Sequence, residues 1–416
     1  TGAPGMLGAS PPKRDMPATD VPVAEDLAEE QAVRTRLMER AGREGRVRVI
    51  VQLAMPYQLE EKLPPQARDR QRDAIALRSG RLAERVLRTP AGARLKTFKT
   101  LPFMSMEVDQ DELAALLADS GIASVTEDRL HAPALASSTQ TIGATTQWQA
   151  GYDGTGQVVA VLDTGVRLDH PFLSGAIVSE ACYSTNYALY SATSLCPGGV
   201  TASIAPGSGT DCSGATGCGH GTHVAGIVAG DGATMRGVAP GAGIIAINVF
   251  TKVSSSTYCG SSTPCALAFT SDIVSGLERT YLLRNSFNIA AVNMSLGGGS
   301  YASACDANDP STATAIGNLR AAGIATVIAS GNNGYTGSIS SPACISSAIS
   351  VGATNKTPPI GVASYSNSAT ILDLLAPGSS IYSSTIDGSY GFKSGTSMAT
   401  PHVAGAFAVL RQRYPH

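Results

Sequence analysis

The sequence predicts an α/β protein in two parts: a doubly wound parallel sheet over residues 136–416, and before it a small α+β sandwich over residues 46–135. Two observations predict this division. Beyond residue 156, apolar runs without polar alternation are separated by helix-like segments, as in strands buried on both faces of a parallel sheet. The composition also changes near residue 135, because residues 1–135 hold 20 of the 30 Lys and Arg but only 8 of the 45 glycines.

The first 45 residues are predicted to be an extension of the sandwich. Their start, "TGAPGMLGASPPKRDMPATDVP", is polar and rich in proline, a composition typical of disordered chain. The stretch 24–42, "AEDLAEEQAVRTRLMERAG", predicts a charged helix that ends at Gly42 or Gly45.

The sandwich is predicted from segments in the order β-α-β-β-α-β, which is that of a ferredoxin-like fold. The predicted strands are 46–53, a pair within 94–109 that breaks at Leu101-Pro102, and 121–130; the predicted helices are 68–88 and 110–119. This part contains neither cysteine nor a cluster of catalytic residue types, so we expect the chemistry elsewhere.

The doubly wound sheet is predicted from apolar runs that alternate with helix-like segments. The runs are 157–163, 242–250, 289–296, 324–331 and 348–354, and the helix-like segments are 221–230, 271–283 and 313–323. No repeat of solenoid period interrupts this order.

All eight cysteines lie beyond residue 180, among Gly, Ser, Thr and Pro. Their even number predicts four disulfides and an oxidising compartment. Eight cysteines allow about 105 connectivities. We expect the nearest-neighbour pairs, which are Cys182–Cys196, Cys212–Cys218, Cys259–Cys265 and Cys305–Cys344. Zinc binding is the alternative, but no C-x-x-C spacing supports it.

The charge balance and hydropathy argue against two kinds of partner. The net charge of −2 does not favour nucleic acid or an anionic membrane surface. No apolar run reaches the roughly 18 residues that span a bilayer. The chain starts at Thr1 without a charged-then-apolar segment, so we expect any export signal to have been removed or to be absent.

Chemically useful residues follow the predicted strands or begin the predicted helices. Ligands of open parallel sheets bind beyond the carboxyl ends of the strands, so we expect these residues to meet at one edge. They are Asp163, Ser295, Leu296, Gly331 and Asn332 after strands, and His220 and Ser397 at helix starts.

These residue types suit nucleophilic catalysis. A serine such as Ser397 is a weak nucleophile and needs an adjacent base, which His220 can supply. Asp163 can hold the imidazole tautomer and stabilise the imidazolium. Backbone N–H groups at a helix N-terminus, together with the Asn332 amide, can bind a developing oxyanion.

Each motif also has an ordinary structural interpretation. An Asp that ends a strand is often a capping or loop residue, and a lone Ser before a helix is more often an N-cap than a nucleophile. His220 and His223 could form a metal pair, but their spacing on a glycine-rich helix start, without a nearby acid, argues against it. Only the combination of motifs decides.

Taken together, the motifs resemble those of the subtilisin-like serine proteases, or subtilases. Three match as they stand: "VAVLDTGV" around Asp163, "GHGTHVAGIVAG" around His220 and "SGTSMATPHVAG" around Ser397. Their order along the chain is the subtilisin order. "MSLGG" at 294–298 is similar to the family's substrate-pairing strand, which implies substrate contacts by Ser295, Leu296 and Gly297. "ASGNNG" is similar to the oxyanion-hole segment, which implies that role for Asn332 and a substrate contact for Gly331.

The resemblance implies a secreted, monomeric serine endopeptidase made as a zymogen, acting on proteins and peptides through an acyl-enzyme. Residues 46–135 would be its pro-domain, an intramolecular chaperone and inhibitor, and 136–416 its catalytic domain. "VTEDRLHAPALASS" resembles the pro-domain tail that lies in the active-site cleft, so we expect self-cleavage near Ala134 or Leu135, within residues 131–138. An inactive or latent subtilase-fold binding protein, held by its pro-domain, is the alternative.

Three further expectations come from the family pattern. The segments that resemble the S1 pocket, "MSLGG", "ASG" and "GSISSPAC", bring no acid, which favours apolar P1 residues. No metal or cofactor is expected in catalysis, and structural calcium is expected at most at weak sites, because Phe172 follows "DHP" and the loop "DGATM" is short. The chain ends at His416, just past the serine helix, where the family continues, so the catalytic domain is expected to lack its C-terminal end.

Overall fold

An eight-stranded sheet forms the centre of the larger domain in the computed structural model, which describes residues 24–87, 95–128, 130–133, 142–355 and 360–415. The strand order is β18-β17-β15-β13-β6-β10-β7-β9, and only the last pairing in the series is antiparallel. The strands are β6 (Val158–Asp163), β7 (Ile177–Tyr183), β9 (Ala202–Ser203), β10 (Gly243–Asn248), β13 (Ile289–Met294), β15 (Ala325–Ala329), β17 (Ile349–Thr354) and β18 (Leu374–Pro377).

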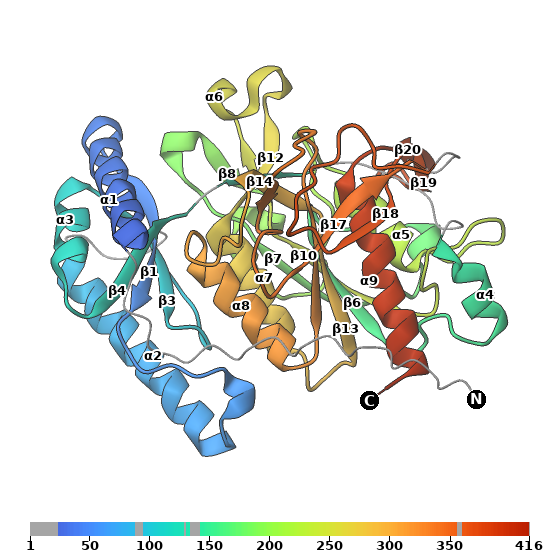
Figure 1. Cartoon of the computed structure of the whole chain (residues 1–416), viewed down its shortest axis with the longest axis horizontal. Helices are drawn as coiled ribbons and strands as arrows, with labels where there is room; N and C mark the ends of the chain where they lie inside the picture. Colours follow the sequence, from blue (N-terminus) through green and yellow to red (C-terminus); the bar gives the residue numbers. More distant parts are fainter. Residues whose placement is uncertain (1–23, 88–94, 129, 134–141, 356–359, 416) are drawn as a thin grey trace, which may run out of the picture.

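Helices cover both faces of this sheet, which confirms the doubly wound prediction (Figure 1). One face packs on α5 (His220–Ala229) and α9 (Thr396–Arg413), and the other on α7 (Thr270–Leu282) and α8 (Pro310–Ala321). Every residue of β6 and of β13 is buried, which is why these runs lack polar alternation. All five predicted runs contain a strand of the sheet. The sequence analysis did not find β7, β9 and β18.

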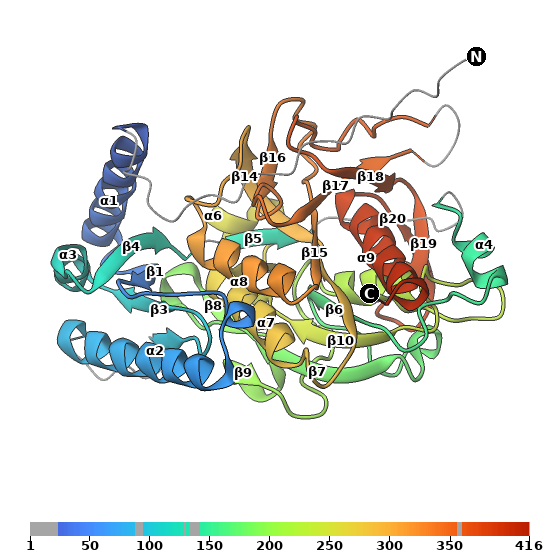
Figure 2. The same cartoon turned by 60° about the horizontal axis from the view of Figure 1, so that its bottom comes forward.

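A second, six-stranded sheet lies beside the carboxyl ends of the central strands, and the sequence analysis did not predict it. Its order is β16-β14-β5-β12-β11-β8. Its strands are β5 (Leu130–Pro133), β8 (Ala192–Ser194), β11 (Thr251–Val253), β12 (Cys265–Phe269), β14 (Leu296–Tyr301) and β16 (Ile339–Ser341). Figure 2 shows β5, from the N-terminal part of the chain, beside β14. Two short helices, α4 (Ala144–Gln149) and α6 (Ser256–Cys259), and a hairpin of β19 (Ile381–Ser384) and β20 (Tyr390–Lys393) complete this domain.

The smaller, N-terminal domain contains an antiparallel sheet in the order β2-β3-β1-β4. Its elements are α1 (Ala24–Glu44), β1 (Val47–Leu53), α2 (Pro65–Val86), β2 (Leu95–Thr97), β3 (Phe103–Val108), α3 (Gln110–Ala118) and β4 (Ile122–Glu127). After α1, the elements follow the predicted order β-α-β-β-α-β. The helix predicted before the sandwich is present, and it ends just before Gly45, whose positive φ of 80° suits glycine.

The two domains pack through the face of the small sheet that its own helices leave uncovered. In Figure 1, α2 and α3 lie on the far side of this sheet, and α7 and α8 lie on the side that faces the central sheet. Ile50, Phe98 and Phe103 belong to the same buried cluster as Leu277 of α7 and Leu319 of α8. The predicted final strand, 121–130, needs correction: β4 ends at Glu127, and β5 begins separately at Leu130. Asp128 lies between the two strands, and its carboxylate accepts hydrogen bonds from Ser271 of α7, which accounts for the break in the strand.

The four expected disulfides are all present, so the zinc alternative for the cysteines is wrong. Each closes a short or medium loop of the larger domain. None of the helices in the described ranges is long and apolar enough to cross a bilayer.

Candidate active site

Asp163 and His220 form a buried hydrogen-bonded pair at the carboxyl edge of the central sheet. Asp163 is the last residue of β6, and its Oδ1 lies 2.6 Å from His220 Nδ1. The same oxygen accepts from Thr164 N at 2.8 Å. Both side chains are fully buried. Two donors on one carboxylate oxygen fix the carboxylate, which can then fix the orientation of the imidazole.

Ser397 lies on the first turn of α9 and is fully buried. The N-cap of this helix is Gly395, so the interpretation of Ser397 as an ordinary N-cap is wrong. Its Oγ donates to Ser295 O at 3.0 Å, and Ser295 Oγ donates to Ser397 O at 2.5 Å. This reciprocal pair joins α9 to the residue that precedes β14.

Asn332 is oriented by the residue before Ser397. Its Oδ1 accepts from Thr396 N at 2.7 Å and from Thr396 Oγ1 at 3.1 Å. Because these bonds use Oδ1, Nδ2 is the branch of the planar amide that does not bind Thr396. This Nδ2 is the donor that the sequence analysis expected for an oxyanion.

Asn367, which the sequence analysis missed, braces the loop that carries Asn332. Its Oδ1 accepts from Asn333 N at 2.9 Å and from Tyr335 N at 3.1 Å, and its Nδ2 donates to Ser330 O at 3.1 Å. Gly331 lies against it with φ of 105°, and a Cβ there would come within 2.3 Å of Asn367 Nδ2. A buried Asn 35 residues after Asn332 leaves no local pattern in the sequence.

β5 fills the space between β14 and β12, called the groove below, and two of the predicted substrate-contacting residues, Leu296 and Gly297, pair with it. β5 pairs antiparallel with β14 on one side, with Leu296 opposite Pro133 and Gly297 opposite Ala132. On the other side it pairs antiparallel with β12, with Phe269 opposite Leu130. An extended chain is thus held by backbone hydrogen bonds on both edges, the arrangement of β-strand addition. The expected cleavage point at Ala134 or Leu135 lies outside the described residues.

The other two histidines near the site have structural partners. His223 Nε2 lies 3.0 Å from Gly391 O, and burial lowers the pKa of His223 to about 3. His402 Nδ1 lies 2.6 Å from Met398 O. Neither residue belongs to a group of three potential ligands, since the described ranges contain no such His, Cys, Asp and Glu cluster.

The residues at the family's strong calcium position do not suit a cation. Phe172 is buried there, and its ring lies against Gly230, where a Cβ would come within 1.9 Å of it. The nearby acid, Asp231, is already paired with Arg236 at 2.7 Å. A hard cation needs several oxygen ligands, and an arginine opposes it.

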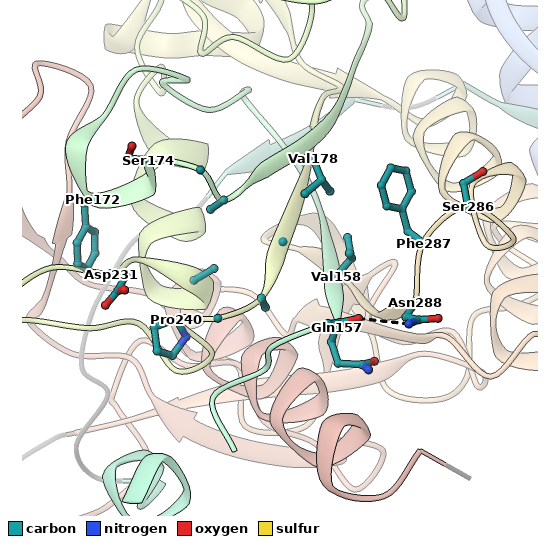
Figure 3. A pocket seen from close by; sticks show the side chains of 17 residues that line it. Gln157, Val158, Phe172, Ser174, Val178, Asp231, Pro240, Ser286, Phe287 and Asn288 are labelled. Atoms are coloured by element: carbon teal, nitrogen blue, oxygen red, sulfur yellow. Dashed lines mark hydrogen bonds between the residues drawn. The ribbon is translucent and has the colours of Figure 1, made fainter. Parts of the chain in front are cut away.

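A pocket of about 500 Å³ opens at the opposite edge of the sheet, away from the Asp163–His220 pair. It is lined by the amino ends of β6 and β10, at Val158 and Gly243. Figure 3 shows Val178 and Phe287 on one side of it and Phe172 on the other. Parallel sheets bind substrates at their carboxyl edge, so this pocket is not the candidate active site.

The N-terminal domain is tied to α7 by buried polar contacts next to the groove. Asp128 accepts from Ser271 N at 2.8 Å and Ser271 Oγ at 2.7 Å, at the start of α7. Arg48, itself buried, donates to Asp128 at 3.1 Å. Further along the boundary, Glu278 of α7 accepts from Thr100 N at 2.5 Å and Thr100 Oγ1 at 2.7 Å. The two domains are therefore joined both by the pairing of β5 and by these polar side-chain contacts.

Comparison with known proteins agrees with the resemblance. The family profile "Peptidase_S8: Subtilase family" matches residues 154–416. Subtilisin E of Bacillus subtilis (strain 168) is 32% identical over 338 residues, which are 79% of this chain and 76% of that protein. An extracellular serine proteinase of Thermus sp. (strain Rt41A) is 34% identical over 338 residues, 78% and 70% of the two chains. The crystal structure of a cold adapted subtilisin-like serine proteinase aligns with a TM-score of 0.45 at 30% identity, over 64% of this chain and 78% of that one.

Proposed function

The chain belongs to the subtilase family of serine proteases, and we propose from this membership and from the site that it is a secreted endopeptidase made as a zymogen. Asp163, His220 and Ser397 are its catalytic triad, and Asn332 is its oxyanion donor. The position of β5 is the observation that carries the proposal. This strand of the N-terminal part of the chain pairs with β14, directly after Ser295, and the carbonyl oxygen of Ser295 accepts a hydrogen bond from Ser397 Oγ.

The reaction assigns one task to each residue. Ser397 Oγ attacks the substrate carbonyl while His220 accepts its proton, and His220 then donates that proton to the leaving amine. Asp163 holds the imidazole through Nδ1 and stabilises the imidazolium. The oxyanion binds Asn332 Nδ2 and the backbone N–H at the start of α9. Water then releases the acyl group by the same steps.

The register of β5 supports the zymogen proposal. Leu296 opposes Pro133 and Gly297 opposes Ala132. The described part of this pairing thus brings the N-terminal part of the chain, up to Pro133, to the strand that follows Ser295. We therefore propose, as the family resemblance implies, that the first cut falls near Ala134 or Leu135, within residues 131–138, and that residues up to this point then act as an inhibitor. Ser295, Leu296, Gly297 and Gly331 would contact later substrates in the same way.

The intact mass of the purified chain, followed over time beside Ser397→Ala, tests this proposal. We expect the parent to split within residues 131–138 and the alanine variant to stay whole. Asn308→Ala, which changes a half-buried residue in a turn outside the site, is the control and should split like the parent. If the parent and Ser397→Ala both stay whole while folded, the alternative of a latent or inactive subtilase-fold binding protein replaces the proposal.

Apolar P1 residues are the proposed preference, because the segments that resemble the S1 pocket contain no Asp or Glu. Cleavage of a peptide library with all P1 side chains tests it. We expect apolar P1 residues to dominate, and a dominance of Lys or Arg would refute the preference.

We also propose that the protein is a secreted monomer without a catalytic cofactor. Four disulfides suit an oxidising compartment, and one relative is named an extracellular proteinase. The residues at the strong calcium position do not fit the ion, so the disulfides would supply stability there instead. Sedimentation of the active enzyme, with and without a chelator, tests both the oligomeric state and the calcium proposal.

A further inference from the structure

The carboxylate of Asp211, a residue outside the proposed triad, lies beside the segments that carry the Asp163–His220 pair. Asp211 Oδ1 accepts from Gly219 N at 2.9 Å and from Thr164 Oγ1 at 3.1 Å. Asp211 Oδ2 accepts from Thr222 N at 3.3 Å and also from Thr222 Oγ1. The side chain thus joins the residue after Asp163 to the residues on either side of His220.

On the helix side, Asp211 supplies a cap that α5 lacks. The N-cap residue, Gly219, has no side chain and adopts φ of 85°. Asp211 binds the N–H of this residue and the N–H of Thr222, which are the two groups that a capping box satisfies. Its negative charge also suits the positive end of the helix. His220 is the first residue of that turn, so the cap fixes the backbone that carries the imidazole.

On the strand side, Thr164 connects Asp211 to the catalytic carboxylate. Thr164 N donates to Asp163 Oδ1 at 2.8 Å, the oxygen that His220 Nδ1 contacts. Thr164 Oγ1 accepts from Gly221 N at 3.0 Å while it donates to Asp211. A continuous set of hydrogen bonds therefore runs from Asp163 through Thr164 and Asp211 to the start of α5.

The loop that carries Asp211 is itself fixed. Asp211 N donates to Val166 O at 3.0 Å, and Cys212 N donates to Thr164 O at 3.0 Å. The disulfide Cys212–Cys218 then closes the loop just before Gly219. Asp211 is held from both ends, as a residue that sets the position of others must be.

We propose that Asp211 is a positioning residue for the reaction: it sets the distance and angle between Asp163 and His220 by clamping the end of β6 to the start of α5. This inference rests on the proposed protease function and adds a residue that the motifs do not mark. A displacement of about 1 Å in a catalytic group costs on the order of 100-fold in rate. Loss of the clamp should therefore lower kcat and leave KM nearly unchanged.

The charge of Asp211 gives a second readout. The charged groups that act on it are Asp163 on β6 and Lys393 on β20, whose Nζ donates to Gly219 O at 3.3 Å. On α5, His220 lies between Gly219 and Thr222, which Asp211 binds, and His223 follows Thr222. Burial, with a contribution from Asp163, raises the pKa of Asp211 to about 6. An anion near an imidazole favours the protonated form of the ring. Removing it should therefore move the acidic limb of the kcat/KM profile to lower pH.

The test compares Asp211→Asn and Asp211→Ala with the parent, after self-cleavage and with active sites counted by burst titration. We expect kcat to fall about 10-fold in Asp211→Asn and about 100-fold in Asp211→Ala, with KM within about threefold of the parent. The acidic limb should move down by about 0.5 pH unit or more in both variants. Asp309→Ala is the matched control: Asp309 caps α8 through Thr312 N, away from the triad, so its loss should lower the melting temperature without changing kcat or the pH limb.

Thr164→Val separates position from charge and covers the case in which Asp211→Ala does not fold. It keeps the carboxylate and its bonds to α5 but removes the link to β6. We expect a fall in kcat of about 10-fold with the pH limb unmoved. Parental kcat in Asp211→Asn and Thr164→Val, or a loss in Asp211→Asn confined to melting temperature, would overturn the inference. An inactive parent would instead refute the proposed protease function.

Discussion

Asp128→Asn should weaken the hold of the N-terminal domain on the catalytic domain. Asp128 is buried, and its carboxylate accepts from four donors. Two of these donors, Ser271 N and Ser271 Oγ, lie across the domain boundary. The other two, Arg48 Nε and Ser105 Oγ, belong to the N-terminal domain and stay bonded to Asp128 when the domains separate.

The size of the effect follows from the two cross-boundary bonds. A hydrogen bond to a charged group contributes about 1.5–3 kcal/mol. In the separated enzyme, water satisfies Ser271, and the amide of Asp128→Asn keeps one acceptor oxygen. We therefore take the lower value for one lost bond and expect about 1.5 kcal/mol, or roughly 10-fold weaker binding of the N-terminal domain. The assay is the lag in peptide hydrolysis after self-cleavage, since under the proposed zymogen mechanism the lag reports release of the N-terminal domain and should become shorter.

Ser105→Ala is the control, because it removes one bond to Asp128 without touching the catalytic domain. Its lag should stay close to that of the parent. A lag in Asp128→Asn equal to that of the parent would refute the reasoning. The bonds from Ser271 of α7 to Asp128 would then add nothing to the affinity of the N-terminal domain.

Three further predictions concern the oxyanion loop, pH and the disulfides. Asn367→Ala removes the acceptor of Asn333 N and Tyr335 N and frees the loop of Asn332, so kcat should fall about 100-fold with little change in KM; a change confined to melting temperature would contradict this. Burial raises the pKa of Glu278 against the opposing effect of its bonds from Thr100, and we expect the N-terminal domain to supply enough of this burial that the proton is held more tightly when the domain is bound. Binding of that domain should weaken as the pH rises through this raised pKa, and a binding titration between about pH 5 and pH 8 should be flatter in Glu278→Gln than in the parent. Replacing Cys305–Cys344, which spans 39 residues, by alanines should cost about 4 kcal/mol in chemical denaturation, and replacing Cys259–Cys265, which spans 6, about 2 kcal/mol; equal costs would show that loop length does not set the stabilisation.

Local patterns in the sequence determined much of the fold. The buried strands β6 and β13 were found because strands covered on both faces must be apolar throughout, and Gly45 marked the end of α1 because it supplies a positive φ. The nearest-neighbour disulfides were found because short loops bring cysteines together at small entropic cost. The family motifs named Asp163, His220, Ser397 and Asn332, each of which lies in a short run of recognisable residues.

The tertiary structure alone decided what joins these motifs. Strand β5 pairs with β12 and β14, which lie far along the chain, so only the family resemblance, and no local strand pattern, placed its residues at the site. The bracing by Asn367 and the clamp by Asp211 join atoms that no local pattern relates. Backbone propensity and hydrophobic periodicity act over a few residues, and they therefore locate helices and strands. A hydrogen bond between distant segments depends on where the whole chain brings them, and these bonds set the geometry of the site.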